Sequence, residues 1–151
     1  MRTVIVRHRR ENLRKCSLRG LEGREDLAFY TYPEDVLPDL SGYLLLKVGA
    51  PPLSCADAGR GLVLIDGTWR LAAVMERQMK GLEARSLPVG VRTAYPRRQT
   101  ACPDPEAGLA SVEALYAAYV ALGLSVEGLL DDYYWRDEFL SLNFGDKFKV
   151  C

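Results

Sequence analysis

Short apolar runs alternate with longer amphipathic stretches along the chain. Three runs, rich in aliphatic and β-branched residues and bounded by glycine or polar residues, predict strands at residues 3–7, 42–48 and 61–66. The last two are almost wholly apolar, as expected for strands buried on both faces of a parallel sheet. Residues 86–93 form a weaker strand candidate, because a proline and a glycine interrupt the run.

Apolar residues recur at three- and four-residue spacings in three longer stretches. This period predicts helices over residues 68–84, 109–122 and 126–142. Strands that come first and then alternate with helices predict an α/β fold built on an open parallel sheet. With 151 residues, the chain has the usual size of one domain, so we expect a single domain over residues 1–151.

Composition and cysteine spacing mainly exclude certain classes of protein and site. The chain is 48% hydrophobic and 26% charged, as is typical of globular proteins. No apolar run approaches the roughly 18 residues that span a bilayer, and the N-terminus does not resemble a signal peptide. We therefore expect a cytoplasmic protein with no membrane partner. The cysteines form no C-x-x-C pair, so we expect neither a zinc site nor, in a reducing compartment, a disulfide: they are Cys16, Cys55, Cys102 and Cys151.

The net charge of zero conceals a segregation of charge along the chain. Residues 1–24 carry 8 basic and 2 acidic side chains, and residues 60–100 carry 8 basic and 3 acidic ones. If the fold brings these two segments to one face, they form a surface that binds polyanions. The alternative is that these side chains only solvate helices and loops.

Residues 62–72 have the pattern of a ligand site. A buried strand runs into Asp66 and a glycine, and Thr68 is suited to be the N-cap of the next helix. Ligands in open α/β sheets bind at the carboxyl ends of strands, where the free N–H groups of a helix N-terminus hold anions. Trp69 would then form an apolar wall. The alternative is that Asp66 and Thr68 only cap the helix and Trp69 packs in the core.

Several segments, taken in order, carry a resemblance to a known family. They are the turn Asp66-Gly67-Thr68-Trp69, the sequence Arg85-Ser86-Leu87-Pro88, residues 109–115 (LASVEAL), residues 135–143 (WRDEFLSLN) and the N-terminal segment 8–21. With these segments the chain resembles the DTW-domain and Tsr3-like family. Members transfer the 3-amino-3-carboxypropyl group of S-adenosylmethionine to a uridine or pseudouridine in RNA.

The resemblance implies a fold similar to the SPOUT methyltransferases, with helices flanking an open parallel sheet. It implies a SPOUT-like core over residues 60–151 with a C-terminal trefoil knot, and a small N-terminal extension within residues 1–59, which carry a basic segment. The partner would be structured rRNA or tRNA, bound by a monomer or a homodimer. Family members often carry further cysteines near the N-terminus where this chain has only Cys16, so we expect no metal.

The resemblance also implies roles for individual residues. The main chain around Ile65, Leu87 and Leu109 would surround the adenine, and the hydroxyl of Ser17 would reach the ribose or the amino-acid arm. Trp69 and Ala72 would line a pocket for the sulfonium methyl. The cofactor set is Ser17, Ile65, Thr68, Trp69, Ala72, Leu87 and Leu109. Asp66 would be either the general base that takes the uridine N3 proton or an orienting acceptor.

Arginines in both basic segments are candidates for contacts with RNA. They are Arg7, Arg9, Arg10, Arg92, Arg97 and Arg98. His8 and Tyr95 lie among them, and a ring between arginines suits unpaired RNA. A structural histidine and a solvated loop are the alternatives. For Glu113 and the aromatic run 133–135 we expect structural roles.

Two rival functions are compatible with the same residues. An RNA methyltransferase would use the same pocket with the methyl group pointing outward. A non-catalytic RNA-binding or ribosome-assembly protein would keep the fold and bind no cofactor.

Overall fold

A computed structural model describes residues 2–14, 16–95 and 108–144, with only the backbone of Trp69. Five strands form one sheet in the order β2-β1-β4-β3-β5, and every pair is parallel. The strands are β1 (Thr3–His8), β2 (Leu27–Tyr32), β3 (Leu44–Leu46), β4 (Leu62–Asp66) and β5 (Glu83–Arg85). The helices of this part of the chain are α1 (Trp69–Arg77), α2 (Ser111–Leu122), α3 (Arg136–Asn143) and a short 3-10 turn, η1 (Cys55–Asp57).

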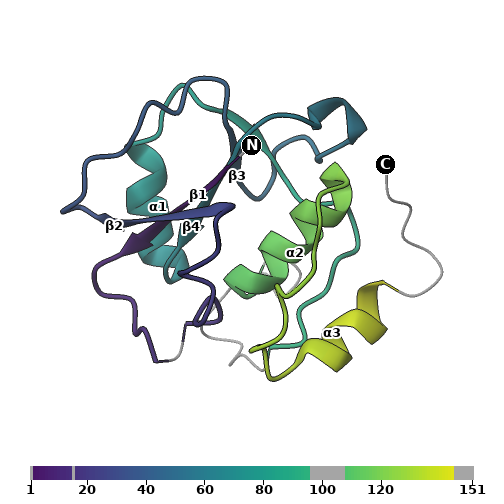
Figure 1. Cartoon of the computed structure of the whole chain (residues 1–151). Coiled ribbons are helices and arrows are strands. Elements are labelled where there is room, and N and C mark those ends of the chain that lie inside the picture. The colour runs from purple at the N-terminus through teal and green to yellow at the C-terminus, as the bar shows by residue number, and fades with distance from the viewer. Residues whose placement is uncertain (1, 15, 96–107, 145–151) are drawn as a thin grey trace.

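The helices cover both faces of the sheet, with α1 on one side and α2 and α3 on the other (Figure 1). Successive residues of a strand point to opposite faces, so each interior strand contributes to two apolar clusters. In β4, Val63 belongs to the same buried cluster as Met75 of α1. Its neighbour Leu62 belongs to the other cluster, which contains Leu115 of α2 and Phe139 of α3. The predicted α/β fold with an open parallel sheet flanked by helices is therefore confirmed.

The strands differ from the predicted ones at two places. The three main candidates correspond to β1, β3 and β4, although β3 is shorter than predicted. Residues 86–93 are not a strand: β5 precedes them at Glu83–Arg85, and Ser86 adds only an isolated bridge to Pro52. Strand β2 was not predicted, because its mixed sequence LAFYTY is neither continuously apolar nor regularly alternating.

The predicted helices hold only in part. Helix α2 matches its prediction, but α1 ends at Arg77, and Gly81 with a φ of 96° allows the turn into β5. Only the second half of the predicted stretch 126–142 is helical, as α3. The N-terminal part is not an extension either, because β1 lies between β2 and β4 in the sheet.

The structure also bears on the expectations about disulfides and about membrane-spanning segments. Cys55 is disulfide-bonded, and Cys16 is a free buried thiol, so the expectation of no disulfide was wrong. The partner of Cys55 lies outside the described residues. Within the described ranges, no helix is long and apolar enough to cross a bilayer.

Candidate functional site

A cavity of about 560 Å³ lies at the carboxyl ends of β3, β4 and β5. Parallel strands end at the same edge of a sheet, so the segments that follow them converge there. Leu46 and Ile65 come from the ends of β3 and β4, and Leu87 follows β5. Ala72 of α1 lies in one wall, and Leu109 and Ser111 at the start of α2 lie in another. The cavity therefore has the size and position of a small-molecule site.

The cavity is mainly apolar and carries a few polar groups. Two charged side chains, Lys47 and Glu76, belong to its lining. Glu76 lies one turn after Ala72 on α1, which places both residues on the same face of the helix. A Cβ atom at Gly67 would lie 3.2 Å from Met75 Cε, so a side chain at this lining position would crowd the buried methionine of α1. An apolar site with one anionic and one cationic group suits a nucleoside that carries an amino-acid arm.

Asp66 lies beside the cavity and is almost completely buried, with an exposed fraction of 3%. Its Oδ2 accepts hydrogen bonds from Arg7 Nε at 3.0 Å and from Cys16 Sγ at 3.1 Å. Its Oδ1 accepts a hydrogen bond of 2.7 Å from Ser111 Oγ. Ser111 is the one of these partners that lines the cavity. Asp66 therefore reaches the cavity through Ser111, a geometry that fits an orienting acceptor better than a base.

Arg7 is the counter-ion of this buried carboxylate. Its guanidinium lies 4.9 Å from the centroid of the Phe29 ring and 3.6 Å from Glu22 Oε1. The exposed fraction of its side chain is 11%. Arg7 is therefore not placed to contact phosphate and is not part of an exposed basic surface.

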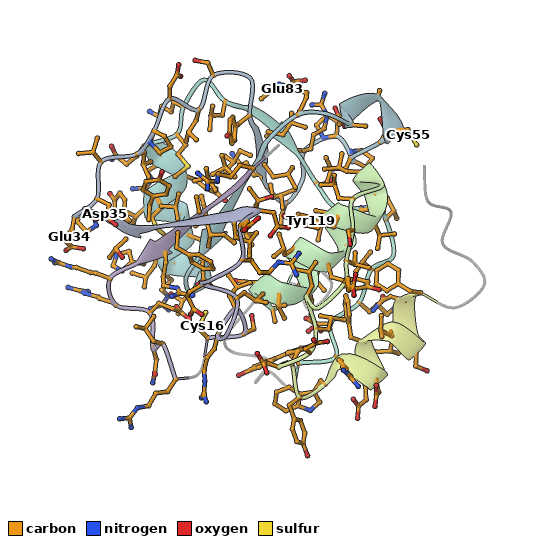
Figure 2. The ribbon with its side chains drawn as sticks, viewed as in Figure 1. Cys16, Glu34, Asp35, Cys55, Glu83 and Tyr119 are labelled. Carbon is orange, nitrogen blue, oxygen red and sulfur yellow. The ribbon has the colours of Figure 1, made fainter. Side chains whose placement is uncertain are left out.

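Cys16 takes part in the same network. Arg7 Nη2 donates to its sulfur at 3.4 Å. Burial raises the pKa of the Cys16 thiol to about 12, and the negative charge of Asp66 acts in the same direction. The thiol is therefore protonated at neutral pH and serves as a hydrogen-bond donor. Figure 2 labels Cys16, and its hydrogen bond to Asp66 ties the thiol to the carboxyl end of β4.

Glu11, Cys16 and Asp66 also offer three ligand atoms within 4.8 Å of one another. The guanidinium of Arg7 already supplies the positive charge that a metal ion would bring to this cluster. The expectation of no metal stays a prediction.

The start of α2 is fixed by a buried carboxylate. Glu113 is fully buried, and its Oε1 accepts hydrogen bonds from Thr93 Oγ1 at 2.6 Å and from the N–H of Ala110 at 2.8 Å. Its Oε2 accepts a hydrogen bond of 2.8 Å from the N–H of Ala94. Glu113 thus joins the loop before residue 95 to the helix end that lines the cavity. The structural role predicted for this residue is confirmed.

The predicted cofactor residues divide into three groups. Ile65, Ala72, Leu87 and Leu109 line the cavity together. Thr68 is the N-cap of α1, as predicted, but is exposed and does not belong to the lining. Ser17 also lies outside the lining, where its Oγ accepts a hydrogen bond of 3.0 Å from the N–H of Val112. Trp69 begins α1, and its side chain is outside the described part of the structure.

The residues predicted to contact RNA differ in their exposure. Arg9, Arg10 and Arg92 are exposed, and Arg9 forms an ion pair of 3.3 Å with Glu34. Arg97 and Arg98 lie outside the described residues. His8 is buried, and its Nδ1 accepts a hydrogen bond of 3.1 Å from the N–H of Arg10, which is a structural role.

Lys47, Glu76 and Ser111 are among the cavity residues that were not predicted. Glu76 could have been found from its i+4 spacing to Ala72 on the predicted helix. Lys47 follows a predicted strand, which is a weaker signal. Nothing in the sequence indicates that Ser111 meets Asp66, because that contact joins positions 45 residues apart.

The chain is similar to a solved structure described as the SAM-dependent rRNA:acp-transferase Tsr3 from Vulcanisaeta distributa. Sequence identity is 27% and the TM-score is 0.72, over 93% of this chain and 77% of that one. No protein-family model and no curated protein matches the chain. In fold and in sequence, the chain is therefore similar to a SAM-dependent rRNA:acp-transferase.

Proposed function

We propose that this protein binds S-adenosylmethionine in the cavity at the carboxyl ends of β3, β4 and β5 and modifies RNA with its aminocarboxypropyl group. One observation carries the proposal. Four residues to which the family resemblance assigns the cofactor, namely Ile65, Ala72, Leu87 and Leu109, line one cavity of about 560 Å³. The similar solved structure is described as a SAM-dependent rRNA:acp-transferase.

The lining fits the chemistry of this group donor. Loop backbone and aliphatic side chains suit the adenine, which is planar and largely apolar on its faces. Glu76 offers a negative charge to the ammonium group, and Lys47 offers a positive charge to the carboxylate of the amino-acid arm. The apolar wall around Ala72 suits the sulfonium methyl.

The proposed transfer breaks one bond and forms one. A ring nitrogen of the uracil base loses its proton to solvent water and attacks the carbon of the arm next to sulfur. The carbon–sulfur bond breaks, the electron pair neutralises the sulfonium, and 5'-methylthioadenosine leaves. Orientation of the arm toward the RNA selects this carbon over the methyl carbon, because only the nearer electrophile meets the nucleophile.

In this proposal Asp66 positions Ser111 and does not take the proton. Its two oxygens already accept three hydrogen bonds, and Arg7 holds its charge. Asp66→Asn should therefore reduce the transfer rate by less than the roughly 10²–10⁴-fold that loss of a general base causes. A larger loss in a variant that still folds and binds the donor would restore the role of base.

Finer features rest on the family resemblance and remain proposals. They are the SPOUT class with its C-terminal knot, the choice between uridine and pseudouridine and between rRNA and tRNA, and the oligomeric state. The single domain, expected from the length, and the cytoplasmic location, expected from the sequence pattern, are proposals too. Tracing a knot requires residues 96–107, which lie outside the described residues.

Calorimetric titration with S-adenosylmethionine tests the binding step. Wild type should bind, and Ala72→Phe should abolish binding because the larger ring fills the cavity. Ala73→Phe is the matched control: its position is the next one on α1, exposed and outside the lining, so binding should persist. The proposal fails if wild type does not bind, which would favour a non-catalytic protein, or if both variants bind as wild type does.

A further inference from the structure

A second cavity of about 500 Å³ lies between the N-terminal segment 14–20 and residues 132–135, which lead into α3. Its chemistry differs from that of the first. The lining combines two arginines with several aromatic rings and one aspartate. Rings next to arginines are the combination that proteins use to hold unpaired nucleotides.

The aromatic wall presents an accessible ring on a fixed support. Tyr134 is 84% exposed, and its ring packs edge to face on Trp135 at 5.0 Å between centroids. Trp135 packs in turn against Tyr95 at 4.9 Å. The structural role predicted for the run 133–135 therefore holds for buried Tyr133 but not for Tyr134. An exposed tyrosine whose ring rests on Trp135, which in turn packs on Tyr95, is a platform on which a base can stack.

The opposite wall is basic. Arg14 and Arg19 are both exposed, and Arg19 Nη1 donates a hydrogen bond of 3.4 Å to the carbonyl of Arg14. Within residues 2–14, 16–95 and 108–144, neither guanidinium forms an ion pair with a carboxylate. Their charge is thus available to an anionic ligand that enters the cavity.

One acidic side chain, Asp132, belongs to the same lining and lies next to the basic wall. Asp132 lies so close to Gly20 that a side chain there would come within 2.3 Å of its Oδ2. A carboxylate repels phosphate, so the phosphate of a bound nucleotide belongs on the side of Arg14 and Arg19. The base then belongs on the rings of the aromatic wall.

A hydrogen-bonded wall separates the two cavities. Cys16 and Ser17 line the second cavity. Cys16 donates to Asp66, whose other oxygen accepts from Ser111 in the first cavity. Ser17 accepts a hydrogen bond from the N–H of Val112, directly after Ser111. A ligand of the second cavity is therefore a near neighbour of a ligand of the first.

We infer that the second cavity binds an unpaired nucleotide of the RNA, with its base on Tyr134 and its phosphate on Arg14 and Arg19. The inference rests on the proposed function for the identity of the partner. It assigns the binding of RNA to residues that the sequence analysis did not propose as RNA contacts. The arginines predicted from sequence in the first basic segment, Arg7, Arg9 and Arg10, are not in the lining of this cavity.

Fluorescence anisotropy with a labelled oligouridylate of about 12 nucleotides tests the inference on the full chain. Tyr134→Ala should weaken binding about tenfold, while Tyr134→Phe, which keeps the ring, should bind as wild type does. The slope of the logarithm of the binding constant against the logarithm of the salt concentration reports the number of phosphate contacts. The Arg14→Gln/Arg19→Gln double variant should reduce the magnitude of this slope by about 1.4, because it loses two contacts with single-strand phosphates. Arg77→Gln, an exposed change on α1, is the charge control and should alter neither.

Three results would overturn the inference: no binding by wild type, equal binding by Tyr134→Ala, or equal losses in the Arg77 control and the double variant. Calorimetry with S-adenosylmethionine on the same proteins separates this failure from that of the proposed function. Donor binding without ring-dependent RNA binding refutes the second site alone. Ring-dependent RNA binding without donor binding refutes the proposed function and leaves the second site standing.

Discussion

Asp66 is only 3% exposed, so its charged carboxylate is stabilised by the groups that surround it, and the stability of the fold depends on them. Asp66→Ala leaves the guanidinium of Arg7 buried without its counter-ion. Removing one partner of a buried ion pair costs about 3–5 kcal/mol, so the free energy of unfolding should fall by that amount. Urea denaturation measures it.

The matched control is the exposed pair of Arg9 and Glu34, whose side chains are 55% and 49% exposed. Glu34→Ala removes the same kind of partner from solvent and should cost less than about 1 kcal/mol. Equal costs for the two alanine variants would show that the Arg7–Asp66 pair is not a buried ion pair in solution.

The Cys16 thiol predicts how stability depends on pH. Burial, together with the charge of Asp66, raises its pKa from 9.0 to about 12 in the folded protein. Burial likewise raises the pKa of Tyr119 from 10.0 to about 12. A raised pKa means that the folded state holds its proton more tightly, so this stability is complete below pH 9 and is lost as pH rises toward 12.

Urea denaturation from neutral to strongly alkaline pH checks this prediction. The free energy of unfolding of wild type should decrease above pH 9. Cys16→Ser keeps a donor for Asp66 but does not titrate there, so the decrease should be smaller. An identical pH dependence in the two proteins would contradict the burial of this thiol.

At the scale of elements, Glu113 connects the loop before Tyr95 to the start of α2. Glu113→Ala leaves the hydroxyl of Thr93 and two backbone N–H groups without their acceptor. Each buried unsatisfied group costs about 1–3 kcal/mol, so we expect a loss of more than about 2 kcal/mol. Binding of S-adenosylmethionine should also weaken, because Leu109 and Ser111 at this helix end line the cavity.

Tyr119 provides the control at the other end of α2. Its hydroxyl lies 2.9 Å from Thr3 Oγ1 and 3.3 Å from Asp26 Oδ2, at the amino ends of the strands. Tyr119→Phe should cost about 1 kcal/mol and leave donor binding unchanged. Denaturation and calorimetry on both variants check this. If the two variants weaken donor binding equally, the effect comes from general stability and not from the cavity wall.

The elements also show where sequence patterns succeed and fail. Strand β4 is a nearly continuous apolar run because both faces of the sheet are covered, and β1 is rich in β-branched residues, so both strands were predictable. Edge strand β5 is three residues long with the sequence EAR and is partly exposed. Its pairing with β3 comes from the tertiary fold, so no local period signals it. The predicted helix over 126–142 fails at its start, where Gly128 adopts a φ of 78°.

For the candidate site, local signals located one corner of the cavity. The turn from β4 into α1 was predicted from its own sequence, and the family resemblance added Leu87 and Leu109. Contacts between distant segments could not be predicted in this way. Arg7 looked like a surface cation because arginines surround it, but the fold pairs it with a carboxylate 59 positions away.

At the scale of the whole molecule, the two cavities lie on either side of one hydrogen-bonded wall. The first is mainly apolar and lies at the edge of the sheet, and the second is basic and aromatic. The net charge of zero gives no hint of this separation. On the two proposals above, the second cavity would hold a nucleotide of the RNA next to the group donor in the first.

The most direct measurement identifies the small product after incubation of the protein with S-adenosylmethionine and unmodified ribosomal RNA. Mass spectrometry should find 5'-methylthioadenosine in an amount equal to a newly formed aminocarboxypropyl uracil nucleoside in the RNA. S-adenosylhomocysteine with a methylated nucleoside would contradict the proposed orientation of the arm, and unchanged donor with unmodified RNA would contradict the proposed enzyme.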